Sequence, residues 1–335
     1  MSCFSIRSII QSFTNRLSFR HQFSDILIGG GGSSNYLEGN AGNDLAIGGC
    51  SLINFSNNYL LESIISTSPD VGKSDVIRMG DGNDIAIGGF GNDTIDGYNG
   101  TNILVGDSAL LRFHKEPLST DLDVENFWSA PRSVESIDCV CGDGDLIFGG
   151  NGTDYIIGGA LDDEVYGHRG ADLVLGDHGK IVLYESPPYK LLNVTTLNAS
   201  CSPGRDKLYL GDGADIAFGG ALGDIIEGGT GQDIILGDFG LYRDQVEYLP
   251  NQFYESITED YEYAGPDVID GGPDDDILMG QEYDDTIEGG GGSDDIYGGH
   301  HKLFGKNRSL IDVQVVSIER FVSHFSPRIH RQRHE

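Results

Sequence analysis

The sequence predicts an all-β solenoid built from a short repeat, and three observations lead to that prediction. Fifty of the 335 residues are glycine, about twice the usual share, and they do not recur at every third position. Aspartate returns every nine residues, as in Asp145, Asp154 and Asp163, and an apolar residue follows each of these positions by two. A unit this short buries its apolar side chain only by stacking on its neighbours, which makes a solenoid the expected architecture.

The chain is strongly acidic, with 53 Asp and Glu residues against 21 Lys and Arg and a formal net charge of −32. This sign argues against nucleic acid as a partner, because phosphate backbones repel such a surface. Carboxylates packed at this density also repel one another unless a cation neutralises them. We therefore expect a structural cation.

The nine-residue spacing defines 19 positions, of which 17 hold Asp and two hold Asn. Blocks of four begin at Asp75, Asp145, Asp206 and Asp267; a shorter first block contains Asn35 and Asp44, with Asp25 one residue out of step. The residue two places further on was not used for this alignment, yet it is apolar in every case. These residues are Leu27, Leu37, Ala46, Ile77, Ala86, Ile95, Leu104, Ile147, Ile156, Val165, Val174, Leu208, Ala217, Ile226, Ile235, Ile269, Leu278, Ile287 and Ile296. Acidic composition alone does not produce this second pattern, so the period is real.

Each unit reads G-G-x-G-x-D-x-U-x, where U is aliphatic, and the best copies are GGNGTDYII and GGTGQDIIL. The x-U-x triplet is long enough for a very short strand with U on one side. The glycines that follow reverse the chain in a turn that a side chain would obstruct. Two nonapeptides therefore make one coil, with two strands, two turns and the U residues stacked inside.

This unit resembles the nonapeptide of the hemolysin-type, or repeat-in-toxin, calcium-binding proteins, over most of residues 25–299. The resemblance implies a right-handed parallel β-roll solenoid that binds calcium between successive turns on the same edge. Ions are then expected between loops 18 residues apart, such as the loops ending at Asp145 and Asp163, Asp154 and Asp172, Asp206 and Asp224, or Asp267 and Asp285. Because Asp and Gly are common in any exposed turn, a metal-free, hydrogen-bonded solenoid is the alternative.

Carried over position by position, the resemblance assigns one metal ligand to each nonapeptide, and several Ca2+ ions to the chain. Calcium prefers several oxygen ligands, which backbone carbonyls and an Asp carboxylate at the end of each turn supply. Asn102 keeps an oxygen but lacks the charge, so a weaker site is expected there. The assigned ligands are Asp44, Asp75, Asp84, Asp93, Asn102, Asp145, Asp154, Asp163, Asp172, Asp206, Asp215, Asp224, Asp233, Asp267, Asp276, Asp285 and Asp294.

Less regular segments interrupt the repeat array, which spans residues 21–299. They lie at about 50–72, 108–135, 180–204 and 241–266; three open on a Gly-Asp pair, and several contain a later strand-like run. These features predict β-hairpin insertions that return to the same stack, with aromatic residues that cover a face of the roll. Residues 1–20 are expected to form a basic N-terminal tail, residues 300–322 a C-terminal cap with a strand at 309–321, and residues 323–335 a basic tail.

No catalytic motif is evident in the sequence. The His-Glu-x-x-His pattern of zinc proteases and the Gly-x-Ser-x-Gly pattern of lipases are missing. The triplet Gly72-Lys73-Ser74 lacks the earlier glycine of a phosphate-binding loop. Since the repeats and their insertions occupy nearly the whole chain, the protein is not expected to be an enzyme.

The expected function is that of a calcium-binding repeat protein whose roll folds around, and is stabilised by, rows of Ca2+. One alternative is a calcium-stiffened structural or adhesive spacer that binds a surface or a carbohydrate through its insertions; another is the non-catalytic appendage of a toxin or secreted enzyme. An unbroken ladder of Thr or aromatic residues would favour a spacer, and none is evident in the repeats.

The cellular setting is predicted mainly from the resemblance, which implies an extracellular or cell-surface location. The sequence shows no signal peptide and no apolar run long enough to span a membrane. Residues 1–20 weakly resemble an organellar transit peptide, because they are rich in Arg and Ser and free of acidic residues. Calcium is the only partner that the sequence specifies, and a protein or carbohydrate partner is left open.

Overall fold

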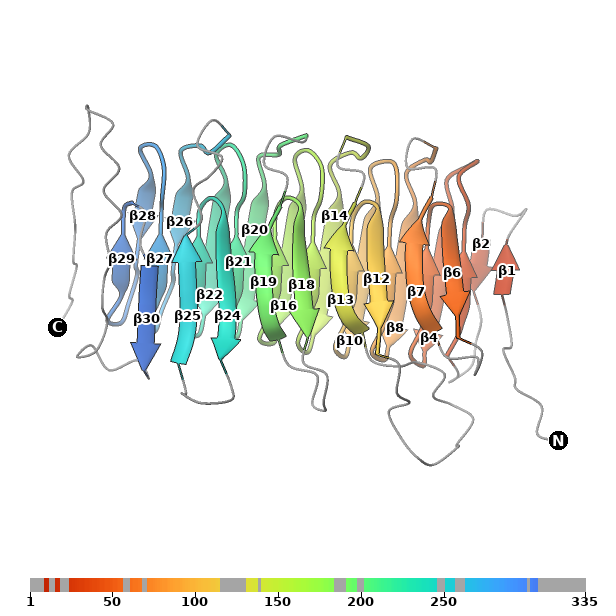
Figure 1. Ribbon diagram of the computed structural model, residues 1–335, viewed down its shortest axis with the longest axis horizontal. Helices are drawn as coiled ribbons and strands as arrows, with labels where there is room; N and C mark the ends of the chain where they lie inside the picture. The colour runs from red at the N-terminus through yellow and green to blue at the C-terminus, as the bar shows by residue number, and fades with distance from the viewer. Residues whose placement is uncertain are drawn as a thin grey trace.

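The computed structural model describes residues 9–11, 16–18, 24–56, 61–67, 71–114, 131–137, 140–183, 191–197, 202–245, 251–256, 263–299 and 302–306. These residues form thirty β-strands in three sheets, and no helix occurs among them. The strands stack side by side along one long axis, from β1 at one end to β29 at the other (Figure 1). The predicted all-β parallel β-roll with hairpin insertions is confirmed.

The first sheet, sheet A, contains eleven parallel strands of three residues each. Its register places equivalent positions of successive coils side by side, as in the pairing of Ile156 with Val174. The strands are β1 (Ile9–Gln11), β3 (Ile26–Ile28), β5 (Leu45–Ile47), β9 (Ile85–Ile87), β11 (Ile103–Val105), β15 (Tyr155–Ile157), β17 (Leu173–Leu175), β21 (Ile216–Phe218), β23 (Ile234–Leu236), β27 (Ile277–Met279) and β29 (Asp295–Tyr297).

The second sheet, sheet B, contains ten parallel strands and faces sheet A across the roll. From β3 to β29 the chain alternates between the two sheets, so each coil contributes one strand to each. The strands are β2 (Arg16–Ser18), β4 (Tyr36–Ala41), β8 (Val76–Asp81), β10 (Thr94–Asn99), β14 (Leu146–Asn151), β16 (Glu164–Arg169), β20 (Lys207–Asp212), β22 (Ile225–Thr230), β26 (Val268–Asp270) and β28 (Thr286–Glu288).

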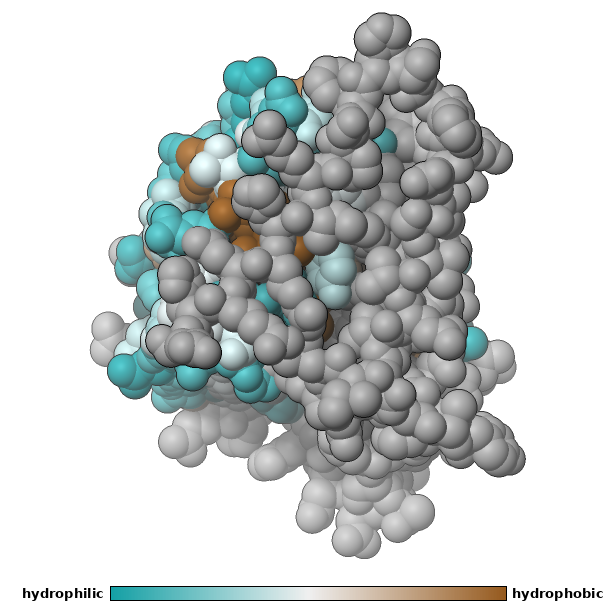
Figure 2. Space-filling view, turned by 90° about the vertical axis from the view of Figure 1, so that its left-hand side faces the viewer, coloured by the Kyte–Doolittle hydropathy of each residue, from teal (hydrophilic) through white to brown (hydrophobic). Residues whose placement is uncertain are grey.

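The apolar residue of each nonapeptide forms the core between sheets A and B. Seventeen of these 19 side chains are buried in one continuous cluster. Ile287 and Ile296, in the last two repeats, are only half-buried. Figure 2 looks at this end of the stack and shows apolar residues among hydrophilic ones there. The alignment from sequence thus identified the narrow core of the roll.

The third sheet, sheet C, is antiparallel and is built from the insertions, each of which is a β-hairpin that follows a sheet A strand. The four hairpins pair with one another, and β30 adds the ninth strand of this continuous sheet along the roll (Figure 1). Its strands are β6 (Ser51–Phe55), β7 (Leu61–Ser66), β12 (Ala109–Phe113), β13 (Pro131–Ser136), β18 (Gly179–Leu183), β19 (Leu191–Thr196), β24 (Gly240–Gln245), β25 (Asn251–Ser256) and β30 (Lys302–Lys306).

Sheet C covers the outer face of sheet A and forms a second core with it. Side chains such as Ile85 and Ile87 from sheet A pack against Leu111 and Val134 from the hairpins. Most sheet A strands are therefore apolar at all three positions, as in IAI, ILV and IIL, whereas sheet B strands alternate. The outer face of sheet B carries no such layer among the described residues.

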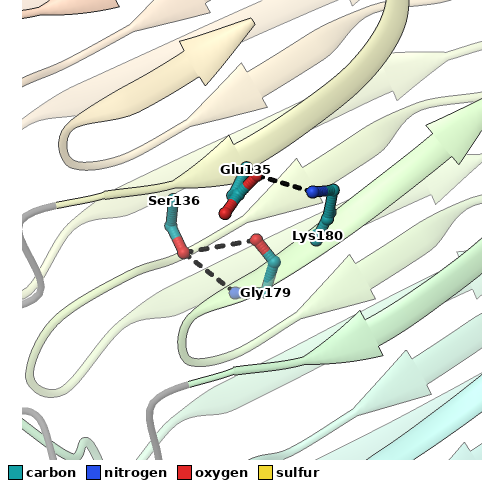
Figure 3. Close-up of polar contacts among 4 residues, drawn as sticks. All are labelled: Glu135, Ser136, Gly179 and Lys180. Carbon is teal, nitrogen blue, oxygen red and sulfur yellow. Dashed lines mark hydrogen bonds and ion pairs between the residues drawn. The ribbon is translucent and has the colours of Figure 1, made fainter.

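A hydroxyl group ties each hairpin to the next in sheet C. The amide of Gly179 donates to Ser136 Oγ at 2.9 Å, and the same hydroxyl donates to the Gly179 carbonyl at 3.3 Å (Figure 3). Ser66 accepts a hydrogen bond from the amide of Ala109 in the same way. Beside this contact, Lys180 Nζ lies 2.8 Å from Glu135 Oε2. These contacts align neighbouring hairpins that are far apart in the sequence.

The two ends of the chain add further strands. Within the segment expected to be an N-terminal tail, β1 pairs with β3 and β2 pairs with β4, which extends the stack by two strands. Within the expected C-terminal cap, β30 pairs with β25 and continues sheet C. The predicted strand at 309–321 and the basic tail at 323–335 lie outside the described residues. The part of the chain that the structure describes has no helix long and apolar enough to cross a membrane.

Candidate metal centre

Two rows of acidic residues follow the two edges of the roll. The A row consists of the Asp or Asn directly before each sheet A strand from β3 to β29, and the B row of the Asp or Asn directly before each sheet B strand from β4 to β28. The A row is Asp25, Asp44, Asp84, Asn102, Asp154, Asp172, Asp215, Asp233, Asp276 and Asp294; the B row is Asn35, Asp75, Asp93, Asp145, Asp163, Asp206, Asp224, Asp267 and Asp285. All 17 predicted ligands belong to these rows, and all but the half-buried Asp285 are buried.

One side-chain oxygen of each residue connects it to the neighbouring coil. In both rows Oδ1 accepts a hydrogen bond from the backbone amide of the preceding row member. The amide of Asp145 donates to Asp163 at 2.7 Å, and the amide of Asp154 donates to Asp172 at 2.8 Å. The ladder is continuous along the A row and along the B row.

The ladder also shows which loops are neighbours where a hairpin intervenes. The loop pairs predicted at a separation of 18 residues are all adjacent, including Asp206 with Asp224. At the hairpins the neighbouring members are further apart in sequence: Asp44 contacts Asp84, and Asp93 contacts Asp145. The rule of 18 residues therefore holds within a block and fails across each insertion, because the hairpin leaves the stack and returns to the next coil.

The second carboxylate oxygen, Oδ2, is buried and accepts no hydrogen bond in twelve of the Asp residues. A buried carboxylate oxygen without a donor is costly unless a cation or a proton compensates it. These residues are Asp44, Asp84, Asp93, Asp145, Asp154, Asp163, Asp172, Asp206, Asp215, Asp224, Asp267 and Asp285.

In most loops Oδ2 converges with a backbone carbonyl above a glycine, whereas the loops before Asp84 and Asp215 have the buried side chains of Met79 and Leu210 at the equivalent position. A Cβ atom placed on Gly149 would lie 2.7 Å from Asp154 Oδ2 and 2.9 Å from the Gly167 carbonyl oxygen of the next coil. On Gly39, it would lie 2.5 Å from Asp44 Oδ2 and 2.7 Å from the Met79 carbonyl. The absence of a side chain at this glycine leaves a small space, the glycine cradle, whose walls are oxygen atoms.

Burial disfavours the charged form of these carboxyl groups. Desolvation raises the pKa of Asp44 to about 7 and that of Asp84 to about 8. The backbone hydrogen bond to each carboxylate opposes this shift, while the charge of a neighbouring Asp adds to it. In the B row, desolvation and adjacent carboxylates raise the pKa of Asp145 and Asp163 well above the usual range. This shift favours the protonated form of these groups unless a cation compensates their charge.

The donor atoms suit a hard cation such as Ca2+. Every donor identified in the cradle is a carboxylate or carbonyl oxygen, the ligand type that calcium prefers. Within the described ranges, no group of three or more His, Cys, Asp or Glu side chains could hold a metal. A cation in the cradle would thus take one carboxylate from its loop and further oxygens from backbone carbonyls. Few side chains and many carbonyls are what a short Gly-rich turn can offer.

The two Asn residues behave differently from the Asp residues. Asn102 Oδ1 accepts from the amide of Asp84 at 3.1 Å, so it maintains the ladder, but its amide nitrogen stands where Oδ2 would be. Asn35 donates through Nδ2 to Asp75 Oδ1 at 2.9 Å and to the Gly48 carbonyl at 3.3 Å. Its own amide therefore occupies the cradle. Both sites offer a cation less than an Asp site does.

Three further Asp residues were not predicted to have a role. Asp107, Asp177 and Asp238 form the Gly-Asp pairs that open three insertions, and all are buried. Asp177 accepts from the amides of Gly204 and Ala221, and Asp238 accepts from those of Gly265 and Glu282. Each of these two carboxylates thus joins the end of an insertion to the next coil. The repeated Gly-Asp pair was the available sequence signal, but its partners could not be read from spacing.

Comparison with known proteins identifies the repeat. The family model for the RTX calcium-binding nonapeptide repeat matches residues 29–49, 80–108, 142–179, 202–226, 218–240, 263–282 and 270–299. Searches of curated proteins and of solved structures found no match. The matched segments contain most of both rows and most of the glycine cradles. The chain therefore belongs to the RTX calcium-binding nonapeptide repeat family, and it is a calcium-binding repeat protein.

Proposed function

We propose that both edge rows bind several Ca2+ ions and that the roll folds around them. The observation that carries this proposal is the set of buried Oδ2 atoms without hydrogen bonds, nine of which lie beside a carbonyl oxygen of the next coil above a glycine. The Asp carboxylates neutralise the ions, and the carbonyls complete their coordination. Without calcium, the ionised carboxylates within each row repel their neighbours along the whole roll, so folding and ion binding are coupled.

Circular dichroism of the full chain, titrated with calcium after purification in chelator, tests this coupling at neutral pH. We expect a cooperative gain of β signal at roughly 0.1–1 mM calcium, as for other extracellular calcium modules. Magnesium at the same concentrations is the control, because it demands a tighter octahedral site and dehydrates reluctantly. A chain that is fully folded in chelator and indifferent to calcium would show that the roll is a metal-free scaffold.

Two adjacent Asp residues give a matched pair of variants. Asp163 belongs to the B row and has a buried Oδ2, whereas Asp162 is exposed and accepts a hydrogen bond from the amide of Arg205. Asp163→Asn keeps Oδ1 for the ladder but loses the charge, so we expect the calcium midpoint to rise about two- to fivefold through the lower ligand charge. Asp162→Asn removes the same charge outside the row and should leave the midpoint within error. Equal shifts in both variants would contradict a specific role for the row.

We also propose that the protein has no catalytic activity of its own and acts outside the cell or at its surface. The support is that repeats and hairpins account for nearly all described residues, and that extracellular calcium modules operate at 10⁻⁴ to 10⁻³ M. Accessibility of the protein in intact cells to an externally added protease tests the location. Complete protection, with cleavage only after lysis, would overturn it.

A further inference from the structure

The outer face of sheet B carries an aromatic cluster in the middle of the roll. Phe148 and Tyr166 stack with ring centroids 5.2 Å apart, and Tyr166 and Tyr209 stack at 4.9 Å. The His168 ring lies parallel to Phe148 and Tyr166 at 6.0 Å from each. Phe148, Tyr166 and Tyr209 occupy equivalent positions of neighbouring strands. At the equivalent position, strands of other coils have Glu38, Arg78, Glu227, Asp270 or Glu288. This aromatic cluster was not evident in the sequence, because it forms only when coils from two blocks stack.

A groove of about 640 Å3 runs beside this cluster. Its lining includes the aromatic cluster, Gly150 and Gly211, and the polar side chains of Asn151, Arg169 and Asp212. Unlike the face of sheet A, this face has no hairpin layer over it in the described structure. The volume lies within the range of small-molecule binding sites, about 300–1,000 Å3.

Two residues at the groove adopt a backbone conformation that favours glycine. Tyr98 has φ of 74° and His168 has φ of 73°, at a position near the end of a sheet B strand where neighbouring coils have Gly80, Gly150 and Gly211 with positive φ. A side chain in this region is strained and persists where its surroundings impose it, commonly at functional sites. Here the strain places two rings over the groove, and the Tyr98 side chain is 56% exposed. The repeat tolerates glycine at this position, so the fold does not require either ring.

The chemistry of the groove indicates the kind of ligand. Arg169 lies 3.4 Å from Asp212, and Asp96 also lines the groove, so the local charge does not favour an anion. Strand β14 pairs with β10 and β16, and β16 pairs with β20, so the backbone groups of this face are already engaged in the sheet. A peptide strand could not add to it by backbone pairing. The remaining means of recognition are ring surfaces and the polar ends of Asn, Asp and Arg side chains.

We propose that this groove binds a neutral oligosaccharide lying along the roll axis. The apolar face of a hexose ring packs on the exposed Tyr98 ring and along the edges of the stacked rings, and its hydroxyl groups bond to Asn151, Arg169 and Asp212. Successive strands are about 4.8 Å apart, which is close to the repeat of a hexose unit in an extended chain. This site is separate from the calcium rows, although it needs the folded roll.

A glycan array probed with the calcium-loaded full chain tests the proposal. The array carries neutral, acidic and amino-sugar oligosaccharides, and a lysine oligopeptide is measured in parallel. We expect saturable binding to neutral oligosaccharides. Absence of binding to every neutral glycan, or binding to the lysine peptide alone, would overturn the proposal, and the second outcome would assign the groove to a basic protein partner.

Variants at this strained position in sheet B separate binding from folding. Tyr98→Gly restores the residue that neighbouring coils use, so the thermal midpoint should not fall, while affinity for the glycan identified on the array should fall about tenfold, a loss of about 1.4 kcal/mol. Asn40→Gly is the matched control, because Asn40 has φ of 77° at the equivalent position of strand β4 but does not line the groove. Its affinity should stay unchanged. Glycan affinity that is insensitive to Tyr98→Gly would place the ligand elsewhere.

Discussion

At the scale of single residues, most row Asp residues divide two tasks between their two oxygens. Oδ1 accepts the amide of the neighbouring coil, and Oδ2 faces the glycine cradle. Asn102 shows that the tasks are separable, because it keeps the first and lacks the second. The nine-residue period predicts which residues lie in the rows. It does not predict this division, which depends on the side-chain rotation that the ladder imposes.

The glycine cradle can be tested by filling it. Gly149→Ala places a methyl group beside Asp154 Oδ2 and the Gly167 carbonyl, while φ at this position allows alanine. We expect the free energy of unfolding in saturating calcium to fall by about 1–3 kcal/mol, with a raised calcium midpoint, because the methyl group overpacks the space. Gly49→Ala is the control, since its Cβ would meet nothing closer than 3.6 Å. Unfolding followed by fluorescence in urea measures both, and equal values would refute the cradle.

Asp177 should matter for stability through its hydrogen bonds. Asp177→Ala leaves the amides of Gly204 and Ala221 without their acceptor, and the expected loss is about 1–3 kcal/mol for each orphaned buried donor. Asp162→Ala, at an exposed position with one amide donor, should cost less than about 1 kcal/mol. Urea unfolding in excess calcium compares the two variants. A cost for Asp177→Ala no larger than that for Asp162→Ala would exclude a joining role.

At the scale of elements, strand composition reports which faces are covered. Sheet A strands are apolar throughout because they pack on sheet B and on the hairpins, whereas sheet B strands alternate because one face is open. Strands and hairpins followed from the sequence pattern. That four separate hairpins join into one sheet did not, since Ser136 and Gly179 meet only after two intervening coils have formed.

The contact between sheets A and C predicts a large effect of one leucine and a small effect of its neighbour. Leu111 is fully buried between the sheets, whereas Leu110, on the same strand, is only partly buried. Leu111→Ala should lower the free energy of unfolding by about 2–5 kcal/mol, and Leu110→Ala by clearly less. Calorimetry of the calcium-loaded protein measures both. Similar losses would mean that the hairpins do not form a core with the roll.

At the scale of the whole molecule, the two rows make stability depend on pH in opposite ways with and without calcium. Burial raises the pKa of Asp44 and Asp215 to about 7 and that of Asp84 and Asp172 to about 8, against an ordinary value of 3.8. Without calcium, protonation of these groups stabilises the fold, so this contribution is complete below about pH 4 and is lost as the pH rises through about 7 to 8. With calcium, the ionised form is required, and acidification releases the ions.

The β signal of the protein in chelator should therefore decrease between pH 5 and pH 8, whereas in excess calcium it should persist at pH 8. Calcium binding at pH 7 should also release protons, which calorimetry in two buffers of different ionisation enthalpy detects. A signal in chelator that does not change with pH, together with no proton release, would contradict the assignment of these carboxyl groups.

Long-range stacking is the part of the molecule that the sequence did not predict. Neighbours in the rows across a hairpin, such as Asp93 and Asp145, follow from how the hairpin closes and not from the period. The same stacking brings Tyr166 and Tyr209 together. Both are properties of coil order, which a local repeat pattern does not contain.

The order of coils and hairpins restricts how such a gene can change in length. Consecutive hairpins are separated by four strands, two in sheet A and two in sheet B, and each hairpin contributes two strands to sheet C. Loss of one nonapeptide would exchange the two faces for everything downstream, and loss of two would leave a two-stranded hairpin over a single coil. Duplication or deletion of sequence is compatible with the fold only in units of four nonapeptides with their hairpin. We therefore expect related chains to differ in length by whole modules of this kind.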